Sequence, residues 1–190
     1  GFARTAMTDE AFRESITANL TCRYTPGESC AERMDEFLSR CFYFSGQYNS
    51  RDSFHALYRK LREHEGETEA DRIFYFAVPP AIFHDIASSL GGAGLVRPAG
   101  SSPWTRVVVE KPFGVDRASS DELSRQINSV FDERPIFRID HYLGKEVIQN
   151  LMALRFANLI FEPIWHRLSV DKTFIPWAQP IGIEGRAGYF

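Results

Sequence analysis

The feature that most constrains the fold is an apolar run at residues 73–78, Ile-Phe-Tyr-Phe-Ala-Val, which has no polar face. A run that is apolar on both faces is typical of a parallel strand that helices cover on both sides. Pro79 and Pro80 follow it directly and end the strand. The run therefore predicts a strand in the interior of a parallel sheet.

Strands and helices alternate in the middle of the chain. Apolar residues recur at helical spacing over 82–90 and over 119–130, and further apolar strands are expected at 106–109 and 136–139. Strands that alternate with helices imply right-handed crossovers. The pattern predicts an α/β fold with a doubly wound, Rossmann-like parallel sheet.

Polar residues indicate where several helices begin. Upstream of the sheet we expect helices from about Thr8, Ser29 and Ser50, whose aromatic residues are more consistent with a core than with a ligand site. Further on, Ser119 with Glu122 three residues later forms a capping-box pattern. This pattern predicts that Ser119 caps the helix that follows.

A charged segment, Arg-Ile-Asp-His-Tyr-Leu-Gly-Lys-Glu at 138–146, lies where the last strand ends and a helical pattern begins. If the helix starts near Asp140, His141 and Lys145 share a face of its first turn, and the backbone N–H groups point the same way. Tyr142 adds a hydroxyl, so the segment predicts an anion site, most simply for a phosphate. Asp140 repels phosphate and is better suited to cap the helix or to orient a histidine. The alternative for any lone His-x-x-x-Lys pair is an ordinary capped helix with a solvated first turn.

A second cationic residue is expected at the same edge of the sheet. In open parallel sheets ligands bind beyond the carboxyl ends of the strands. Lys111 follows the strand at 106–109, just as His141 and Lys145 follow the strand at 136–139. We therefore expect Lys111 to converge on the phosphate site.

Composition excludes several classes of function. The 190 residues are 44% hydrophobic and 25% charged, which suffices for a core, and the formal charge of −3 gives no electrostatic reason to expect nucleic-acid binding. No apolar run approaches the roughly 18 residues that a membrane helix needs. Cys22, Cys30 and Cys41 are odd in number and lack Cys-x-x-Cys spacing, so we expect no disulfide and no metal, but reduced thiols in a cytoplasmic protein.

The charged segment also carries a family resemblance. Residues 140–146, Asp-His-Tyr-Leu-Gly-Lys-Glu, resemble the active-site motif of glucose-6-phosphate dehydrogenases without gap or substitution, and 110–114, Glu-Lys-Pro-Phe-Gly, resemble that family's second signature. Further segments that fit the family lie at 1–5, 76–80, 154–158, 163–165 and 183–190. The resemblance implies an NADP-dependent enzyme that oxidises glucose 6-phosphate to the 6-phosphoglucono-lactone in the oxidative pentose phosphate pathway of glucose metabolism.

The resemblance also implies roles for single substrate-site residues. His141, Tyr142 and Lys145 would hold the 6-phosphate, and Asp140 would orient a general-base histidine that lies beyond residue 190. Lys111 would reach toward both the sugar and the cofactor, next to a peptide bond that can be cis.

Four further positions follow from the resemblance. Arg4 would approach the extra phosphate of NADP, and Pro79 would pass beside the nicotinamide. Phe83 stands where the family often has a cofactor-binding tyrosine. Gln179 stands where the family usually has a sugar-binding glutamate, and an amide can still hydrogen-bond a hydroxyl.

For the domains, the resemblance implies an NADP-binding, Rossmann-like domain at 1–143 that lacks its first strand and glycine-rich loop. Residues 144–190 would begin a C-terminal substrate and dimerisation domain of the α+β class with a large sheet. The full-length protein would be a homodimer or homotetramer. Residues 1–190 alone are expected to be inactive, because the glycine-rich loop and the general base are missing.

Two alternatives remain from the sequence. The departures at Phe83 and Gln179 are consistent with a non-catalytic relative that binds phosphosugars or nucleotides. A purely structural or interaction fragment is the other alternative, and the intact phosphate motif argues against it.

Overall fold

The structure, a computed structural model, describes residues 1–20 and 29–176. The chain divides into two compact units, Gly1–Ile139 and Asp140–Phe190. The division falls close to the domain boundary expected after residue 143. That the two units are the two functional domains stays a prediction.

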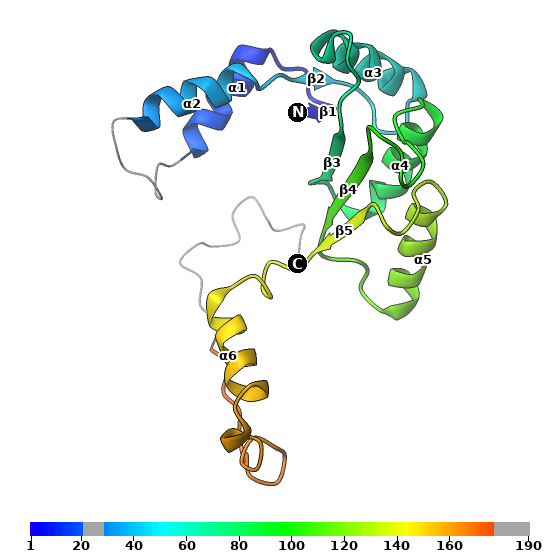
Figure 1. The fold of residues 1–190 in the computed structure, drawn as a ribbon. Helices are drawn as coiled ribbons and strands as arrows, with labels where there is room; N and C mark the ends of the chain where they lie inside the picture. The colour runs from blue at the N-terminus through cyan, green and yellow to red at the C-terminus, as the bar shows by residue number, and fades with distance from the viewer. Residues whose placement is uncertain (21–28, 177–190) are drawn as a thin grey trace. The chain divides into compact units, whose positions relative to one another are not determined.

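The strands described in the first unit form two parallel sheets (Figure 1). The smaller sheet pairs β1 (Phe2–Ala3) with β2 (Phe44–Ser45), and the larger sheet has the order β3 (Arg72–Phe76), β4 (Thr105–Glu110), β5 (Ile136–Ile139). Every pairing is parallel. The parallel α/β fold is therefore confirmed, and the three strands expected in the middle of the chain are all present.

Helices connect these strands. They are α1 (Asp9–Asn19), α2 (Ser29–Ser39), α3 (Arg51–Glu65), η1 (Pro80–Ile82), α4 (Phe83–Gly92) and α5 (Arg117–Asn128), followed in the second unit by α6 (Glu146–Phe156) and η2 (Leu159–Phe161). Thr8 and Ser50 cap α1 and α3 as expected, each with its hydroxyl 3.2 Å from a backbone nitrogen three residues on. Within the described part of the chain, no helix is both long and apolar enough to cross a membrane.

The cap of α5 differs from the expectation. Asp116 is the N-cap, and its carboxylate accepts the Ser119 N–H at 2.8 Å, while the Ser119 hydroxyl bonds back to the Asp116 backbone. The capping box predicted for Ser119 with Glu122 is therefore wrong. Asp116 and Ser119 have the same three-residue spacing one turn earlier, and the helix starts as soon as the turn after Gly114 is complete.

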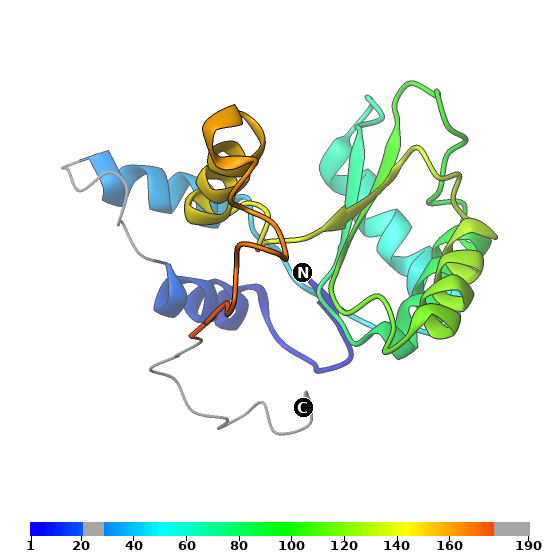
Figure 2. The same cartoon turned by 90° about the horizontal axis from the view of Figure 1, so that it is seen from below.

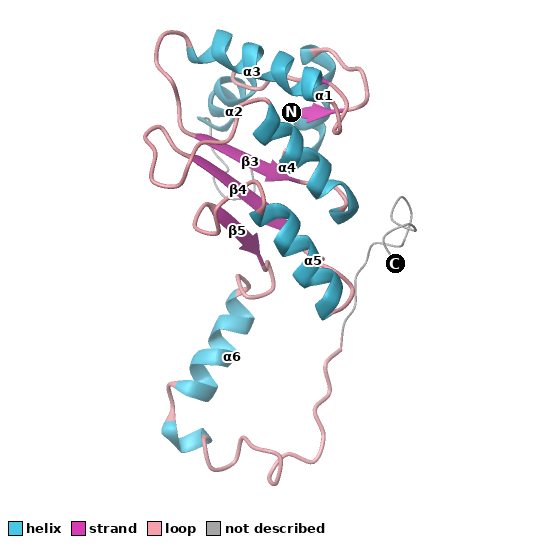
Figure 3. Cartoon of the chain, turned by 90° about the vertical axis from the view of Figure 1, so that its right-hand side faces the viewer, coloured by secondary structure: helices cyan, strands magenta, loops and turns pink. Residues whose placement is uncertain are grey.

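The core lies on one face of the larger sheet. Phe76, Val107 and Val109 alternate toward this face and are buried together with Phe83 of α4 and Ile127 of α5. Figures 2 and 3 show α4 and α5 together on this side of the strands. These two helices follow successive strands that step in the same direction, so right-handed crossovers place both on the same face.

The opposite face carries apolar side chains that are exposed. Ile73 is 60% exposed, and Tyr75 and Phe137 are about half exposed. The sequence predicted a strand covered on both sides, whereas in the described part of the chain only one side of β3 is covered by α4 and α5.

Candidate phosphate-binding and cofactor-binding site

The strands of the larger sheet end at one common edge. Glu110 at the end of β4 pairs in register with Ile139 at the end of β5, and β3 ends beside them. Lys111 follows β4 and Asp140 follows β5. The strand ends that carry the expected site residues are therefore neighbours, as ligand binding at this edge requires.

The segment after β5 forms a tight turn before any helix starts. The Asp140 carboxylate accepts the Tyr142 N–H at 3.0 Å, and the Lys145 N–H donates to the Tyr142 carbonyl at 3.0 Å. Lys145 has extended backbone angles and is the N-cap of α6, which begins at Glu146. The expectation that His141 and Lys145 share a helical face is therefore wrong, because these two hydrogen bonds hold the backbone in turns up to Lys145.

The same turn nevertheless gathers the three expected phosphate ligands. The Lys145 ammonium lies 4.2 Å from the centroid of the Tyr142 ring, and the His141 ring centroid lies 4.4 Å from it. The side chains provide a cation, an imidazole and a hydroxyl. They lie at the amino end of α6, where the helix dipole favours an anion. The arrangement suits a phosphate group.

Lys111 is an exposed residue that directly follows β4. Its peptide bond to Pro112 is cis, as the resemblance allowed. Lys111 belongs to the first unit, whereas His141 and Lys145 belong to the second. The convergence of the three side chains on one ligand therefore stays a prediction.

Sequence reasoning missed a phenol–carboxylate pair next to Lys111. The Tyr75 hydroxyl donates a hydrogen bond to the Glu110 carboxylate, and this bond raises the pKa of Tyr75, with smaller contributions from burial and from the carboxylate charge. Tyr75 pairs in register with Val108, two residues before Glu110, so both side chains lie on one face of the sheet. The two-residue period of the strands could have identified the pair once the register was known.

The expected cofactor residues Arg4 and Pro79 are exposed. The guanidinium carbon of Arg4 lies 5.6 Å from the centroid of the Tyr48 ring. A guanidinium held over an aromatic ring keeps its N–H groups available for a phosphate. Pro79 directly precedes η1, at the carboxyl end of β3.

Of the two remaining expected site residues, the structure describes Phe83 but not Gln179. Phe83 is only 1% exposed and packs edge-on against Phe76, with 5.6 Å between ring centroids. This burial leaves the ring no surface for a cofactor, so the structure gives Phe83 a packing role and does not support the expected contact. Gln179 lies outside the described residues. In the parts that the structure describes, no three His, Cys, Asp or Glu side chains gather as metal ligands.

The fold and the charged residues at the carboxyl edge define a Rossmann-like α/β protein, a class that binds dinucleotide cofactors at this edge. Comparison with known families is more specific. A model described as "Glucose-6-phosphate dehydrogenase, NAD binding domain" matches residues 1–150, and one described as "Glucose-6-phosphate dehydrogenase, C-terminal domain" matches residues 152–190. The chain belongs to the glucose-6-phosphate dehydrogenase family.

Individual relatives agree with this assignment. The chloroplastic glucose-6-phosphate 1-dehydrogenase of Spinacia oleracea is 50% identical over 190 residues, which are 100% of this chain and 32% of that protein. A protein of Arabidopsis thaliana named "Inactive glucose-6-phosphate 1-dehydrogenase 4, chloroplastic" is 46% identical over 167 residues, 88% of this chain and 26% of its own.

A solved structure of a glucose-6-phosphate dehydrogenase in complex with its substrate glucose 6-phosphate aligns with a TM-score of 0.71 and 35% identity, over 88% of this chain and 34% of that one. The chain thus spans about a third of the length of the spinach relative and of this structural neighbour.

Proposed function

We propose that the full-length protein that contains this chain oxidises glucose 6-phosphate at C1 to the 6-phosphoglucono-lactone with reduction of NADP, as an enzyme of the oxidative pentose phosphate pathway. The observation that carries the proposal is the turn that gathers His141, Tyr142 and Lys145 in a member of this family. The activity is proposed for the longer protein. Residues 1–190 alone are expected to be inactive.

The phosphate turn anchors the substrate by a group remote from the reaction. Lys145 supplies a full positive charge, and His141 and Tyr142 supply hydrogen-bond donors to the 6-phosphate. Binding energy from this remote phosphate positions C1 for transfer. Asp140, which already orders the turn through the Tyr142 N–H, orients the general-base histidine supplied by the rest of the protein.

The cofactor side of the site is built from Arg4, Pro79 and Lys111. Arg4 binds the extra phosphate that distinguishes NADP from NAD, which its exposed guanidinium over Tyr48 supports. Lys111 lies between the cofactor and the sugar and contacts both. The chemistry that NADP would supply when bound is a nicotinamide acceptor for the hydride of C1, while the base would remove the proton of the C1 hydroxyl. Gln179 hydrogen-bonds a sugar hydroxyl in place of the usual glutamate.

We assign residues 1–143 to the cofactor domain and residues 144–190 to the start of the substrate domain, through which the full-length protein forms a homodimer or homotetramer. A pocket of about 290 Å³ supports the first assignment, because its lining includes Phe2 of β1 and Ile73 of β3, the strands whose sheets are separate here. In the strand order 3-2-1-4 of a dinucleotide-binding sheet, β1 and β3 of this chain take places 2 and 4, and strand 1 of that order lies between them. That strand would join the two sheets.

The cytoplasmic location expected from the cysteines stays a prediction. The spinach relative is named chloroplastic, so its name gives no support to a cytoplasmic location. Fractionation of the source cells, with the full-length protein followed by antibody, decides between the compartments.

A second candidate is a non-catalytic relative that binds the sugar phosphate or the nucleotide without turnover. The Arabidopsis relative that is named inactive favours this candidate, as does Gln179 in place of a glutamate. Both candidates allow binding of glucose 6-phosphate, so binding alone does not separate them.

The test is a spectrophotometric assay of the full-length protein with glucose 6-phosphate and NADP, with unphosphorylated glucose as the control substrate. The proposal predicts NADPH formation that requires the phosphorylated sugar. Calorimetric binding of glucose 6-phosphate without NADPH formation would establish the non-catalytic relative and contradict the enzyme.

A further inference from the structure

The loop between β4 and α5 is held by the hydroxyl of one serine. Ser119 Oγ accepts the backbone N–H of Val115 at 3.0 Å and that of Asp116 at 3.1 Å, and it donates to the Asp116 carboxylate at 2.6 Å. The bonds from the Ser119 hydroxyl and backbone N–H lower the pKa of Asp116. Three of the loop's polar groups therefore depend on this hydroxyl.

Gly114 brings the loop into direct contact with α5. Its φ of +121° is a conformation that glycine adopts readily and other residues do not. A β-carbon at Gly114 would lie 2.6 Å from the Ser120 nitrogen and 2.8 Å from Ser119 Oγ, closer than such atoms can approach. The backbone of the loop is therefore packed against the first turn of the helix at the position where Ser119 holds it.

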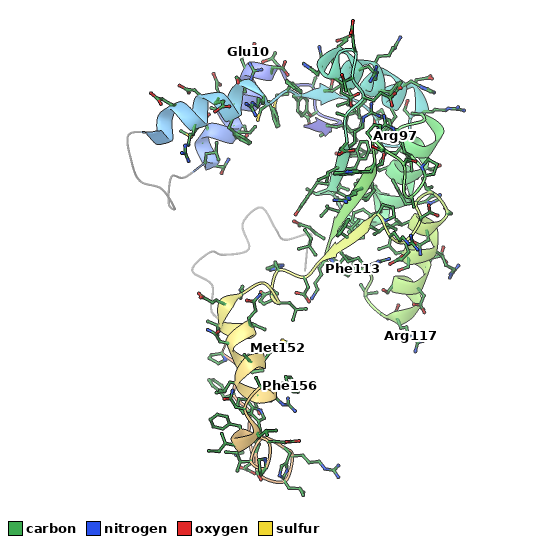
Figure 4. The ribbon with its side chains drawn as sticks, viewed as in Figure 1. Glu10, Arg97, Phe113, Arg117, Met152 and Phe156 are labelled. Carbon is green, nitrogen blue, oxygen red and sulfur yellow. The ribbon has the colours of Figure 1, made fainter. Side chains whose placement is uncertain are left out.

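These contacts fix both ends of the segment that carries Lys111. On one side, Glu110 is held in the sheet by its register with Ile139. On the other side, Phe113 packs against the core and Gly114 packs against α5. Figure 4 labels Phe113 and Arg117, which lie along this connection from β4 to α5. Only two residues separate Gly114 from Lys111, so the conformation of the turn limits where the lysine can point.

We propose that Ser119 is a positioning residue for Lys111: its hydroxyl, together with the close approach of Gly114, sets the turn that presents the lysine to substrate and cofactor. The proposal rests on the proposed function of Lys111. Without the hydroxyl, the N–H groups of Val115 and Asp116 lose their acceptor and turn to water, and the turn loosens. An error of about 1 Å in the placement of a reacting group can lower a rate about a hundredfold.

The test is a double-mutant cycle in the full-length protein with Ser119→Ala, Lys111→Ala and the double variant. Ser119→Ala should lower kcat/KM for glucose 6-phosphate about tenfold or more. In the Lys111→Ala background the same change should have less than about a twofold effect, because Ser119 acts through the lysine. Ser119→Thr, which keeps the hydroxyl, should restore activity. Ser120→Ala is the matched control, since the Ser120 atom nearest to a β-carbon at Gly114 is its backbone nitrogen, which the substitution keeps.

Two outcomes of this cycle overturn the proposal, and they are distinct. If Ser119→Ala lowers kcat/KM by the same factor with and without Lys111, the serine has only a structural role, while the role of Lys111 stands. If Lys111→Ala alone leaves kcat/KM unchanged, the function proposed for Lys111 fails, and the positioning role fails with it.

A second measurement decides the case if the wild-type protein shows no turnover, in which event the proposed function itself has failed. Amide hydrogen exchange is then compared between Ser119→Ala and Ser120→Ala. Exchange about tenfold faster at both Val115 and Lys111 in Ser119→Ala supports the positioning of the lysine segment. Unchanged exchange at Lys111 overturns it.

Discussion

Arg72 and Glu65 form the most completely buried ion pair among the described residues. Arg72 is 7% exposed, and its Nε and Nη2 lie 2.7 and 2.8 Å from the two carboxylate oxygens of Glu65. The hydrogen bonds from Arg72 lower the pKa of Glu65, and the guanidinium also lies 5.2 Å from the centroid of the Tyr58 ring. The pair fixes the end of α3 to the start of β3, at the edge of the sheet opposite the candidate site.

Glu65→Gln should lower the free energy of unfolding of this chain by about 3 kcal/mol at pH 7, because it leaves the buried guanidinium without its counter-charge. The folded-state pKa of Glu65 lies below its unfolded value. The contribution of the pair is therefore complete above the unfolded pKa and is lost as the pH falls through the folded pKa. The deficit of Glu65→Gln should shrink over that range, which urea unfolding at a series of pH values measures.

Glu63→Gln is the matched control for this measurement. Glu63 lies 3.4 Å from Lys60 in an exposed pair, so its replacement should change the free energy of unfolding by less than about 1 kcal/mol. A deficit of Glu65→Gln that stays constant as the pH falls would contradict the account of the buried pair.

For the candidate site, the sequence indicated which side chains lie together, but it did not predict the backbone geometry that brings them together. The motif at 140–146 gave the three side chains that the structure gathers in one turn. Its helical start was wrong, because the Asp140 and Tyr142 hydrogen bonds decide the backbone there and no periodic pattern reports them. Phe83, which was expected at the cofactor, is buried in the structure. An aromatic residue at the start of a helix has the same sequence pattern whether it packs in a core or faces a ligand.

Among the elements, β3 shows the limit of pattern reasoning most clearly. Its continuous apolar run identified a parallel strand, but a run without alternation does not tell which side the helices cover. The structure distinguishes the two sides. Val107, on the face toward α4 and α5, is completely buried, whereas Ile73 on the other face is mostly exposed. The bounds of α5 were predictable to within a turn. The residue that caps its first turn was not, because Asp116 with Ser119 and Ser119 with Glu122 have the same three-residue spacing.

This difference between faces predicts unequal costs for two similar truncations. Val107→Ala should lower the free energy of unfolding of the chain by about 2 kcal/mol, because it removes buried methyl groups and leaves a cavity. Ile73→Ala removes more atoms from the chain but should cost under about 1 kcal/mol, since the side chain is already exposed to water. Urea unfolding of both variants measures the two costs, and equal costs would contradict the assigned core face.

At the scale of the whole molecule, each unit has exposed apolar surface among its described residues. In the first unit this surface is the face of β3 and β5 with Ile73 and Phe137. In the second unit it is α6, where Val147 is 77% and Phe156 71% exposed. Helices with apolar residues around most of their circumference are normally buried. The sequence predicted the fold class from alternation alone, but the alternation did not predict which apolar side chains of the described residues are exposed.

The central claim is that the turn of His141, Tyr142 and Lys145 binds the phosphate of the substrate, and the most direct test is the kinetics of Lys145→Ala in the full-length protein. Loss of a charge-assisted contact should raise KM for glucose 6-phosphate about tenfold or more and leave KM for NADP within about twofold. Lys60→Ala, an exposed lysine of α3, should change neither value. A Lys145→Ala protein that keeps its affinity for the phosphorylated sugar while losing that for NADP would contradict the account.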